Sequence, residues 1–272
     1  MGEYRISRRQ VLQGLAAGML SSCHPALADF SMMSHGERDA LRADPSGSAS
    51  AAVTLEGPRW RLLQQTVERL RRLQTDIGYG HFNLLSFDQA LRHARDHVSV
   101  GAFPSVELDF LEEMFFADAT RYGFFGAKVL TEMTATIPPR AIYKVPDSGH
   151  YLFKGKPLDL YRQVEREVGA TVVLTSGIRG VIKQMYLFLA KAVETEGNLS
   201  LASHSLAPPG HSYHGIGDFD IGRRGLGSKN FTEEFAKTDE FKRLIDLGHV
   251  TIRYPRGNPY GVRYEPWHIG VL

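Results

Sequence analysis

The 272-residue sequence has a single cysteine, Cys23, which lies near the N-terminus. A chain whose only cysteine lies there can build no disulfide framework and no cysteine-based structural zinc site. It also has no thiol nucleophile once that segment has been removed. Any metal ion in the mature protein must therefore be held by histidine and carboxylate side chains.

The apolar run near the N-terminus, residues 11–20, is too short to span a bilayer as a stable helix. Arg8 and Arg9 precede this run and Ala26-Leu-Ala28 follows it, which is the layout of a Tat-type export signal with a cleavage site. We therefore expect residues 1–28 to be a signal peptide, the mature chain to have no transmembrane helix, and its location to be periplasmic or extracellular. Leu20-Ser-Ser-Cys23 also resembles a lipoprotein box, so a lipid anchor at Cys23 is the alternative to cleavage after Ala28.

Neither sign of charge predominates, with 32 Lys and Arg against 30 Asp and Glu. Loss of residues 1–28 removes three arginines and one glutamate and leaves 29 residues of each sign. A formally neutral chain has no basic field to attract a polyanion, so we expect no nucleic-acid partner.

Composition and periodicity divide the remaining chain into three parts. Residues 29–57 are rich in Ser, Ala, Gly and Asp, which predicts a flexible linker. Residues 58–137 form a predicted helical subdomain, with helices from Pro58 toward Gly78, from Ser86 to near His97, and from Ser105 to Tyr122. The second of these helices has four polar residues close together, Arg92, His93, Arg95 and His97. We interpret them as a solvent-exposed helix face rather than as a metal site.

Residues 138–272 form the predicted catalytic domain, which begins at Pro138-Pro139. Helices are expected at 157–168 and 181–193, and Thr232 and Thr238 have the character of helix N-caps. Strands are expected at 170–175, 218–221, 249–254 and 261–271. The sequence therefore predicts an α+β protein. Its helical N-terminal subdomain is followed by a small antiparallel sheet with flanking helices, which carries a zinc site.

The chemistry concentrates in residues 209–222 and 264–268. His214, Asp220 and His268 are nitrogen and oxygen donors suited to a catalytic zinc ion, which needs three protein ligands and an open position for water. Glu265 is a carboxylate able to take that water's proton. Residues 218–221 alternate polar and apolar as a half-buried strand does, so either Asp218 or Asp220 can reach a metal. A histidine in a glycine-rich loop is also commonly a satisfied structural group, which is the alternative.

Arg179 follows the predicted strand at 170–175, where a rigid scaffold commonly places site residues. A fixed cation at that point could stabilise the oxyanion formed when water attacks a peptide carbonyl. The alternative is an ordinary surface arginine.

These segments resemble the zinc D-alanyl-D-alanine carboxypeptidase family, which includes VanX and VanY. The family motif Ser-x-His, Gly, Asp and Glu-x-Trp-His is matched by Ser212, His214, Gly217, Asp220, Glu265, Trp267 and His268. Upstream, residues 175–179 with Gln184 resemble the family's Ser-Gly-Tyr-Arg segment and the Gln that follows it. The interval between the histidine and the aspartate is one residue shorter than usual, so Asp218 remains an alternative ligand.

The resemblance implies a zinc-dependent D,D-carboxypeptidase that trims peptidoglycan stem peptides. In that interpretation His214, Asp220 and His268 bind Zn²⁺, Glu265 deprotonates the attacking water, and Arg179 stabilises the oxyanion. Ser212 and Gln184 would hold the ends of the peptide. Two alternatives stay open: an L,D-carboxypeptidase or peptidoglycan endopeptidase using the same site, and a non-catalytic zinc-stabilised module that binds peptidoglycan.

Overall fold

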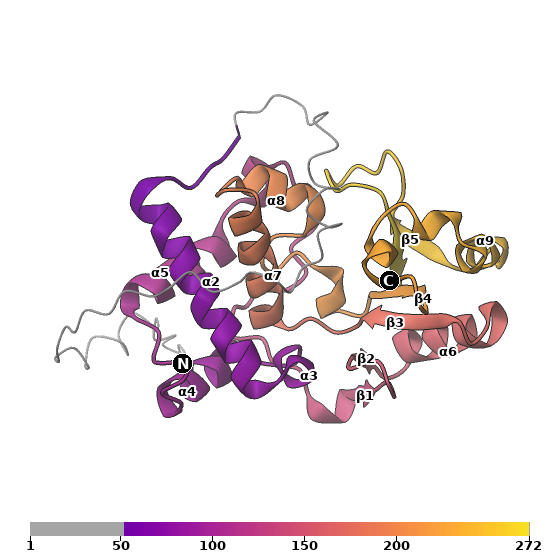
Figure 1. Cartoon of the computed structure of the whole chain (residues 1–272), viewed down its shortest axis with the longest axis horizontal. Coiled ribbons are helices and arrows are strands. Elements are labelled where there is room, and N and C mark those ends of the chain that lie inside the picture. Colours follow the sequence, from indigo (N-terminus) through magenta and orange to yellow (C-terminus); the bar gives the residue numbers. More distant parts are fainter. Residues whose placement is uncertain (1–51, 272) are drawn as a thin grey trace, which may run out of the picture. The chain divides into compact units, whose positions relative to one another are not determined.

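The computed structural model describes residues 52–271, with helices and strands labelled as in Figure 1. By internal contacts the chain divides into Met1–Met33 and Ser34–Leu272, and every described residue belongs to the second unit. The predicted signal peptide and nearly all of the predicted linker lie outside the described residues. The helices are α2 (Gly57–Ile77), α3 (Tyr79–Phe82), α4 (Phe87–Asp96), α5 (Ser105–Phe116), α6 (Lys156–Val168), α7 (Val181–Glu194), α8 (Leu199–Ser205) and α9 (Asp239–Asp246).

Two of the N-terminal helices begin and end where the sequence predicts. Helix α2 has Pro58 in its first turn, and its C-cap is Gly78, whose φ of 87° suits glycine. At the start of α4, the Ser86 hydroxyl accepts from Gln89 N, and the Gln89 side chain accepts from Ser86 N. This reciprocal capping box satisfies two backbone donors that the first turn of a helix leaves free.

The predicted third helix is shorter than expected. Helix α5 ends at Phe116 and is followed by a separate 3₁₀ turn, Ala119–Tyr122, instead of continuing to Tyr122. Ala117 has ψ of 146°, outside the helical region, and the Asp118 side chain accepts from Thr120 N. The aspartate therefore caps a new turn and competes with the helix for the backbone.

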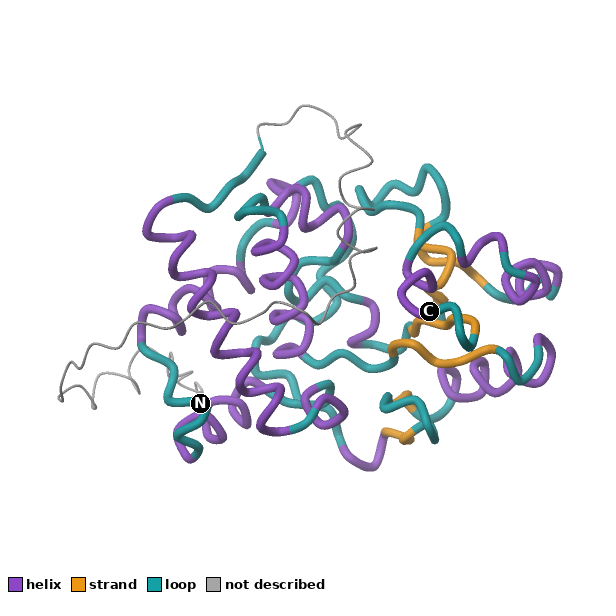
Figure 2. Tube along the Cα trace, viewed as in Figure 1, coloured by secondary structure: helices purple, strands orange, loops and turns teal. Residues whose placement is uncertain are grey.

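The strands form two antiparallel sheets. A two-stranded sheet pairs β1 (Ile142–Lys144) with β2 (Tyr151–Phe153). The larger sheet has the order β3-β4-β6-β5, and its members are β3 (Val172–Ser176), β4 (Phe219–Arg223), β5 (Thr251–Tyr254) and β6 (Glu265–Gly270). Figure 2 shows the strands gathered in one half of the described structure, next to α6 and α9. The α+β prediction, including the terminal strand pair, is confirmed.

Two hydrophobic cores support these halves. One core is built by α2, α4 and α5 together with α7 and α8, and the other by the larger sheet with α6 and α9. Helix α7 contributes Val181, Met185 and Phe188 to the helical core, although it lies beyond the predicted boundary at Pro138. In Figure 1 it accordingly stands beside α2 rather than against the sheet. The boundary between residues 137 and 138 stays a prediction.

The two threonines predicted as N-caps differ. The Thr238 hydroxyl accepts from Phe241 N and caps α9 as expected. Thr232 instead follows a 3₁₀ turn, and its hydroxyl accepts from Glu234 N. Its prediction as a helix cap is wrong, because this hydrogen bond closes a local turn.

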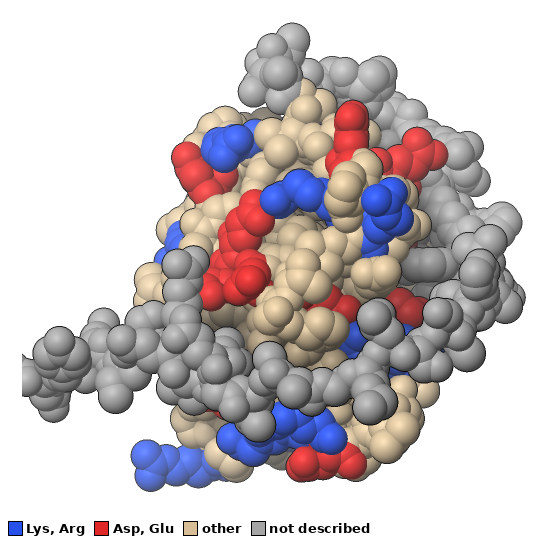
Figure 3. All heavy atoms as spheres, turned by 90° about the vertical axis from the view of Figure 1, so that its left-hand side faces the viewer, with Lys and Arg blue, Asp and Glu red and all other residues tan. Residues whose placement is uncertain are grey.

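Charge is mixed on the face drawn in Figure 3. Acidic and basic side chains are interspersed there among uncharged ones, and neither sign forms a continuous patch on that face. Within residues 52–271, every helix is too short or too polar to cross a bilayer.

Candidate metal centre

His214 is positioned by the glycine-rich loop before β4. It lies in a 3₁₀ turn, Tyr213–Gly215, and is fully buried. Its ring Nδ1 is 2.8 Å from the carbonyl oxygen of Gly177, and a carbonyl can only accept, so Nδ1 carries the proton. The other ring nitrogen, Nε2, therefore keeps its lone pair for a ligand.

Asp220 and His268 face each other across neighbouring strands. The antiparallel register of β4 and β6 pairs them directly. Asp220 Oδ1 lies 3.2 Å from His214 Nε2 and 3.6 Å from His268 Nδ1. All three residues are buried, and one ligand atom from each lies within 4.8 Å of the others. The fold thus gathers the three residues that the sequence predicts as metal ligands.

Two of these atoms are buried without a hydrogen bond. Among the described residues, neither His214 Nε2 nor Asp220 Oδ1 has a hydrogen-bond partner. Burying an unsatisfied polar atom costs about 1–3 kcal/mol, so a native structure normally provides something for it to bind. Ligand atoms of tetrahedral Zn²⁺ lie about 3.3 Å apart, close to the 3.2 and 3.6 Å found between these pairs. The donor set therefore fits a zinc ion.

Asp218 lies on the far side of His268 from this group. Its Oδ2 is 3.2 Å from His268 Nε2, the ring nitrogen that faces away from Asp220. Arg253 donates to both oxygens of Asp218 at 2.7 and 3.0 Å, and Val271 N donates to Oδ1. With its oxygens engaged in this way, Asp218 orients a ligand, and the geometry favours Asp220 as the aspartate that faces the metal.

Glu265 reaches the ligand group from the start of β6. Its Oε2 lies 3.2 Å from His268 Nδ1, and the residue is 7% exposed. Residues three apart in a regular strand point to opposite faces. Here the register of β6 against β5 shifts between Ile252 and Tyr254, opposite the segment that contains Pro266. This bulge brings the side chains of Glu265 and His268 together.

Arg179 binds one of the predicted ligands. Its Nη2 donates to Asp220 Oδ2 at 2.6 Å, and its Nε donates to Ser176 Oγ at 2.9 Å. The guanidinium thereby fixes the carboxylate with Oδ1 toward His214. Its oxyanion role, predicted from sequence, stays a prediction.

Ser212 and Gln184 lie behind the metal ligands. Both are buried, at 5% and 2% exposure. Gln184 Nε2 donates to Ala207 O at 2.6 Å, which ties α7 to the segment leading to His214. Ser212 O accepts from Gly215 N at 3.0 Å and closes the turn that holds His214. These contacts support the loop, and peptide binding by either residue stays a prediction.

Neighbouring charged and polar groups shift the pKa values of the three predicted metal ligands. Burial opposes a charge on His268, but hydrogen bonds with Asp218 and Glu265 outweigh it and raise the pKa of His268 to about 9. Burial likewise opposes ionisation of Asp220, yet its interactions with His214 and then with the Arg179 guanidinium hold its pKa below the usual range. Burial and the charge of Arg179 lower the pKa of His214, which keeps this ring neutral as a ligand must be.

Several supporting residues escaped the sequence analysis. Arg253 pairs with Asp218, and the Tyr254 ring packs edge-on against His268 with centroids 4.8 Å apart. A Cβ on Gly177 would lie 2.0 Å from Tyr151 O, so only glycine fits next to the His214 loop. For His150, burial and then the charges of Arg179 and Lys183 lower the pKa to about 4. The only signal available in sequence was the Thr175-Ser-Gly-Ile-Arg179 motif that contains Gly177.

Comparison with known families agrees with this geometry. Residues 156–270 match the model of VanY, D-alanyl-D-alanine carboxypeptidase. This part of the chain is similar to the VanY family. The family segment includes all three predicted zinc ligands, the predicted base and Arg179. Residues 156–270 thus resemble a VanY-type peptidase domain, and the resemblance predicted from the motifs is confirmed.

Solved structures with detectable similarity are peptidases of related kinds. LdcB, an LD-carboxypeptidase whose structure is described as revealing the basis of peptidoglycan recognition, is 24% identical with a TM-score of 0.41. That match covers 47% of this chain and 63% of the LdcB chain, so this chain spans less than two thirds of that relative. A variant of the D,D-pentapeptidase VanY from a VanB-type resistance cassette, in complex with Zn(II), is 19% identical with a TM-score of 0.37. It is covered over 86% of its length by 53% of this chain.

A third structure is VanYB in complex with D-alanine-D-alanine. It is 22% identical with a TM-score of 0.37, and the match covers 53% of this chain and 85% of that one. No curated protein matches this chain.

Proposed function

We propose that this protein is a zinc-dependent D-alanyl-D-alanine carboxypeptidase that trims peptidoglycan stem peptides. The observation that carries the proposal is the convergence of His214 Nε2 and Asp220 Oδ1 on His268 Nδ1; both are buried atoms with no hydrogen-bond partner among the described residues. A purely structural zinc site is closed by four protein ligands, whereas this group supplies three and has a carboxylate beside it. The match of residues 156–270 to the VanY family model supports the same conclusion.

The residues divide the work of hydrolysis. His214, Asp220 and His268 would hold Zn²⁺, which supplies Lewis acidity to the scissile carbonyl and to the attacking water. Glu265 takes a proton from that water and delivers it to the nitrogen of the departing alanine. Its short distance to His268, 3.2 Å between Oε2 and Nδ1, places the base next to the ligand group.

Arg179 has two effects on this reaction in our proposal. It orients Asp220 through the 2.6 Å hydrogen bond to Oδ2. After burial, its positive charge is the next largest cause that lowers the pKa values of His214 and His150, so its field acts on both groups. A fixed positive field at the site where a negative charge develops lowers the barrier to carbonyl attack, so we assign it the stabilisation of the oxyanion.

Mass spectrometry of stem peptides tests the function. The zinc-loaded protein is incubated with a pentapeptide ending in D-Ala-D-Ala, and the same incubation with a chelator is the control. Loss of one terminal alanine only in the presence of zinc is the expected result. A tetrapeptide whose last bond joins an L,D pair and a crosslinked muropeptide serve as competing substrates.

Other outcomes would replace the proposal. Cleavage of the tetrapeptide alone would indicate an L,D-carboxypeptidase, and cleavage of the muropeptide alone an endopeptidase. Binding to sacculi without release of any product would favour the non-catalytic module. We also propose that the protein works outside the cytoplasm, where peptidoglycan lies, on the basis of the predicted export signal in residues 1–28.

A further inference from the structure

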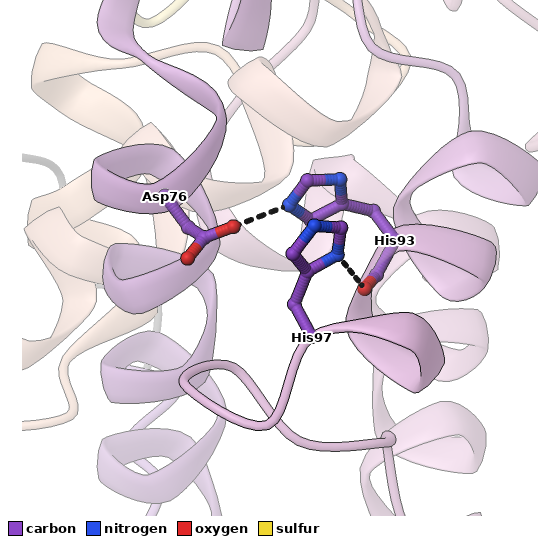
Figure 4. A group of neighbouring side chains, drawn as sticks. All are labelled: Asp76, His93 and His97. Carbon is purple, nitrogen blue, oxygen red and sulfur yellow. Dashed lines mark hydrogen bonds and ion pairs between the residues drawn. The ribbon is translucent and has the colours of Figure 1, made fainter.

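A second group of side chains with metal-ligand donor atoms lies between α2 and α4 (Figure 4). Asp76 is in the last turn of α2, His93 is in the last turn of α4, and His97 is the C-cap of α4. One ligand atom from each lies within 4.8 Å of the others. Two imidazoles and one carboxylate are the donor set of many zinc sites, and it is also the donor set of the buried centre.

The two histidines are aligned by the helix that carries them. Residues four apart lie on one face of a helix, and here the rings are stacked with centroids 3.8 Å apart and an interplanar angle of 13°. His97 Nδ1 lies 2.9 Å from His93 O and must donate to it, because a carbonyl only accepts. This contact leaves the lone pair on His97 Nε2, in the way that ligand histidines are usually fixed through their other nitrogen.

The Asp76 carboxylate is also fixed by hydrogen bonds. Ser99 Oγ donates to Asp76 Oδ1 at 2.6 Å, and Asp76 Oδ2 lies 2.7 Å from His93 Nε2. The hydrogen bonds from Ser99 and then His93 lower the pKa of Asp76, which keeps the carboxylate ionised. Asp76 is an exposed residue, whereas the side chain of His93 is only 19% exposed and is restricted by its neighbours.

We propose that Asp76, His93 and His97 bind a divalent transition-metal ion, with Zn²⁺ as the first candidate, and that this ion clips α4 to α2. On binding, the ion takes the place of the proton between His93 Nε2 and Asp76 Oδ2. Those atoms then move from 2.7 Å to about 3.3 Å apart, a change that rotation of the two side chains can provide.

The sequence predicts that Arg92, His93, Arg95 and His97 form a solvent-exposed face of α4. That prediction holds for Arg92 and Arg95, which are exposed. It fails for His93, whose ring is turned toward Asp76 (Figure 4). Because Arg92 and Arg95 are on the same helix and repel cations, we expect this site to bind zinc more weakly than the buried centre.

Zinc stoichiometry of the untagged full chain tests the site. Equilibrium dialysis at increasing free Zn²⁺, read by metal analysis, should give one tightly bound ion and then a second, weaker one. His97→Gln should weaken the second ion by more than about tenfold, since loss of an outer-shell partner alone costs about 10–100-fold. The double substitution H93Q/H97Q should abolish it, with the first ion retained.

His249→Gln is the matched control. His249 is a half-exposed histidine beside a carboxylate, 3.3 Å from Glu167 Oε2, and lies outside both groups. The substitution His249→Gln should leave both zinc ions bound. His97 is exposed, so His97→Gln is expected to fold even if the double substitution does not.

Melting curves supply an independent readout. Zinc beyond the first equivalent should raise the Tm of the original protein and not that of His97→Gln, because an ion that binds only the folded state stabilises it. The proposal is overturned if only one ion binds, or if His97→Gln binds the second ion as strongly as the original protein. Neither result bears on peptide hydrolysis at the buried centre.

Discussion

Asp218 and His268 are joined through the ring nitrogen that points away from the proposed metal, with Asp218 Oδ2 3.2 Å from His268 Nε2. This contact sets the ring so that Nδ1 faces Asp220. Asp218, which directly precedes β4, and Asp220, which lies in it, therefore have different roles although they are two residues apart. One faces the metal, and the other holds a ligand in place.

Paired substitutions separate these roles. Asp220→Asn should nearly abolish zinc binding, because an amide oxygen is a poor replacement for a carboxylate ligand. Asp218→Asn should lower zinc affinity by about 10–100-fold, as the loss of an outer-shell partner typically does. Competition with a chelating indicator measures both. If Asp218→Asn removed the metal and Asp220→Asn kept it, the assignment of the two residues would have to be exchanged.

The substitution Glu265→Gln should leave zinc binding intact and strongly reduce peptide hydrolysis. The amide is nearly the same size as the carboxylate but cannot accept a proton, so kcat is expected to fall by about 10²–10⁴-fold. Zinc content by metal analysis is the control, and it should stay near that of the unmodified protein. Normal turnover in this variant would exclude Glu265 as the base.

Zinc affinity should rise with pH. In the metal-free protein the pKa of His268 is about 9, so below that pH a proton must leave Nδ1 before zinc can bind. Apparent affinity should therefore increase about tenfold per pH unit between about pH 6.5 and 8.5. Titrations against a chelator of known pH dependence measure this slope. A flat profile would show that His268 is already neutral.

The free energy of unfolding of the metal-free protein should fall as pH rises, whereas zinc affinity rises. A folded-state pKa above the unfolded value of about 6.5 means that this contribution is fully present below pH 6.5. It is lost as pH rises through about 9, at up to about 1 kcal/mol per pH unit. Urea denaturation at several pH values, with zinc-loaded protein as the control, would reveal the difference.

Gly177→Ala should damage the metal centre without touching a ligand. The new Cβ would lie 2.0 Å from Tyr151 O, a backbone atom that cannot rotate away. Because Gly177 O is the acceptor for His214 Nδ1, displacing this backbone moves a predicted ligand. We expect a loss of about 1–3 kcal/mol in unfolding free energy together with weaker zinc binding. Unchanged melting and zinc content would contradict the steric argument.

The sequence predicted well those features that depend on local pattern. The helix ends at Pro58, Gly78 and Ser86 follow from backbone conformation and capping, which neighbouring residues determine. Residue type and spacing similarly drew attention to His214, Asp220 and His268, and the fold brings them together.

Features that depend on distant parts of the chain were not predictable in this way. The pairing of Arg253 with Asp218 joins residues 35 positions apart, and no local pattern encodes it. The choice between Asp218 and Asp220 also required the register of β4 against β6, since both side chains lie on one face. The break at Ala117 depended on competition between the Asp118 side chain and the helix, which periodicity alone does not reveal.

Helix α7 begins two residues after Arg179 and gives its apolar face to the core built by the N-terminal helices. The segment matched by the family model, residues 156–270, contains α7 but not α2, α4 or α5. Expressed alone, that segment would present Val181, Met185 and Phe188 to water and would be prone to aggregate. The segment defined by family resemblance therefore lacks the helices that cover α7, and we expect a stable peptidase domain to begin before α2.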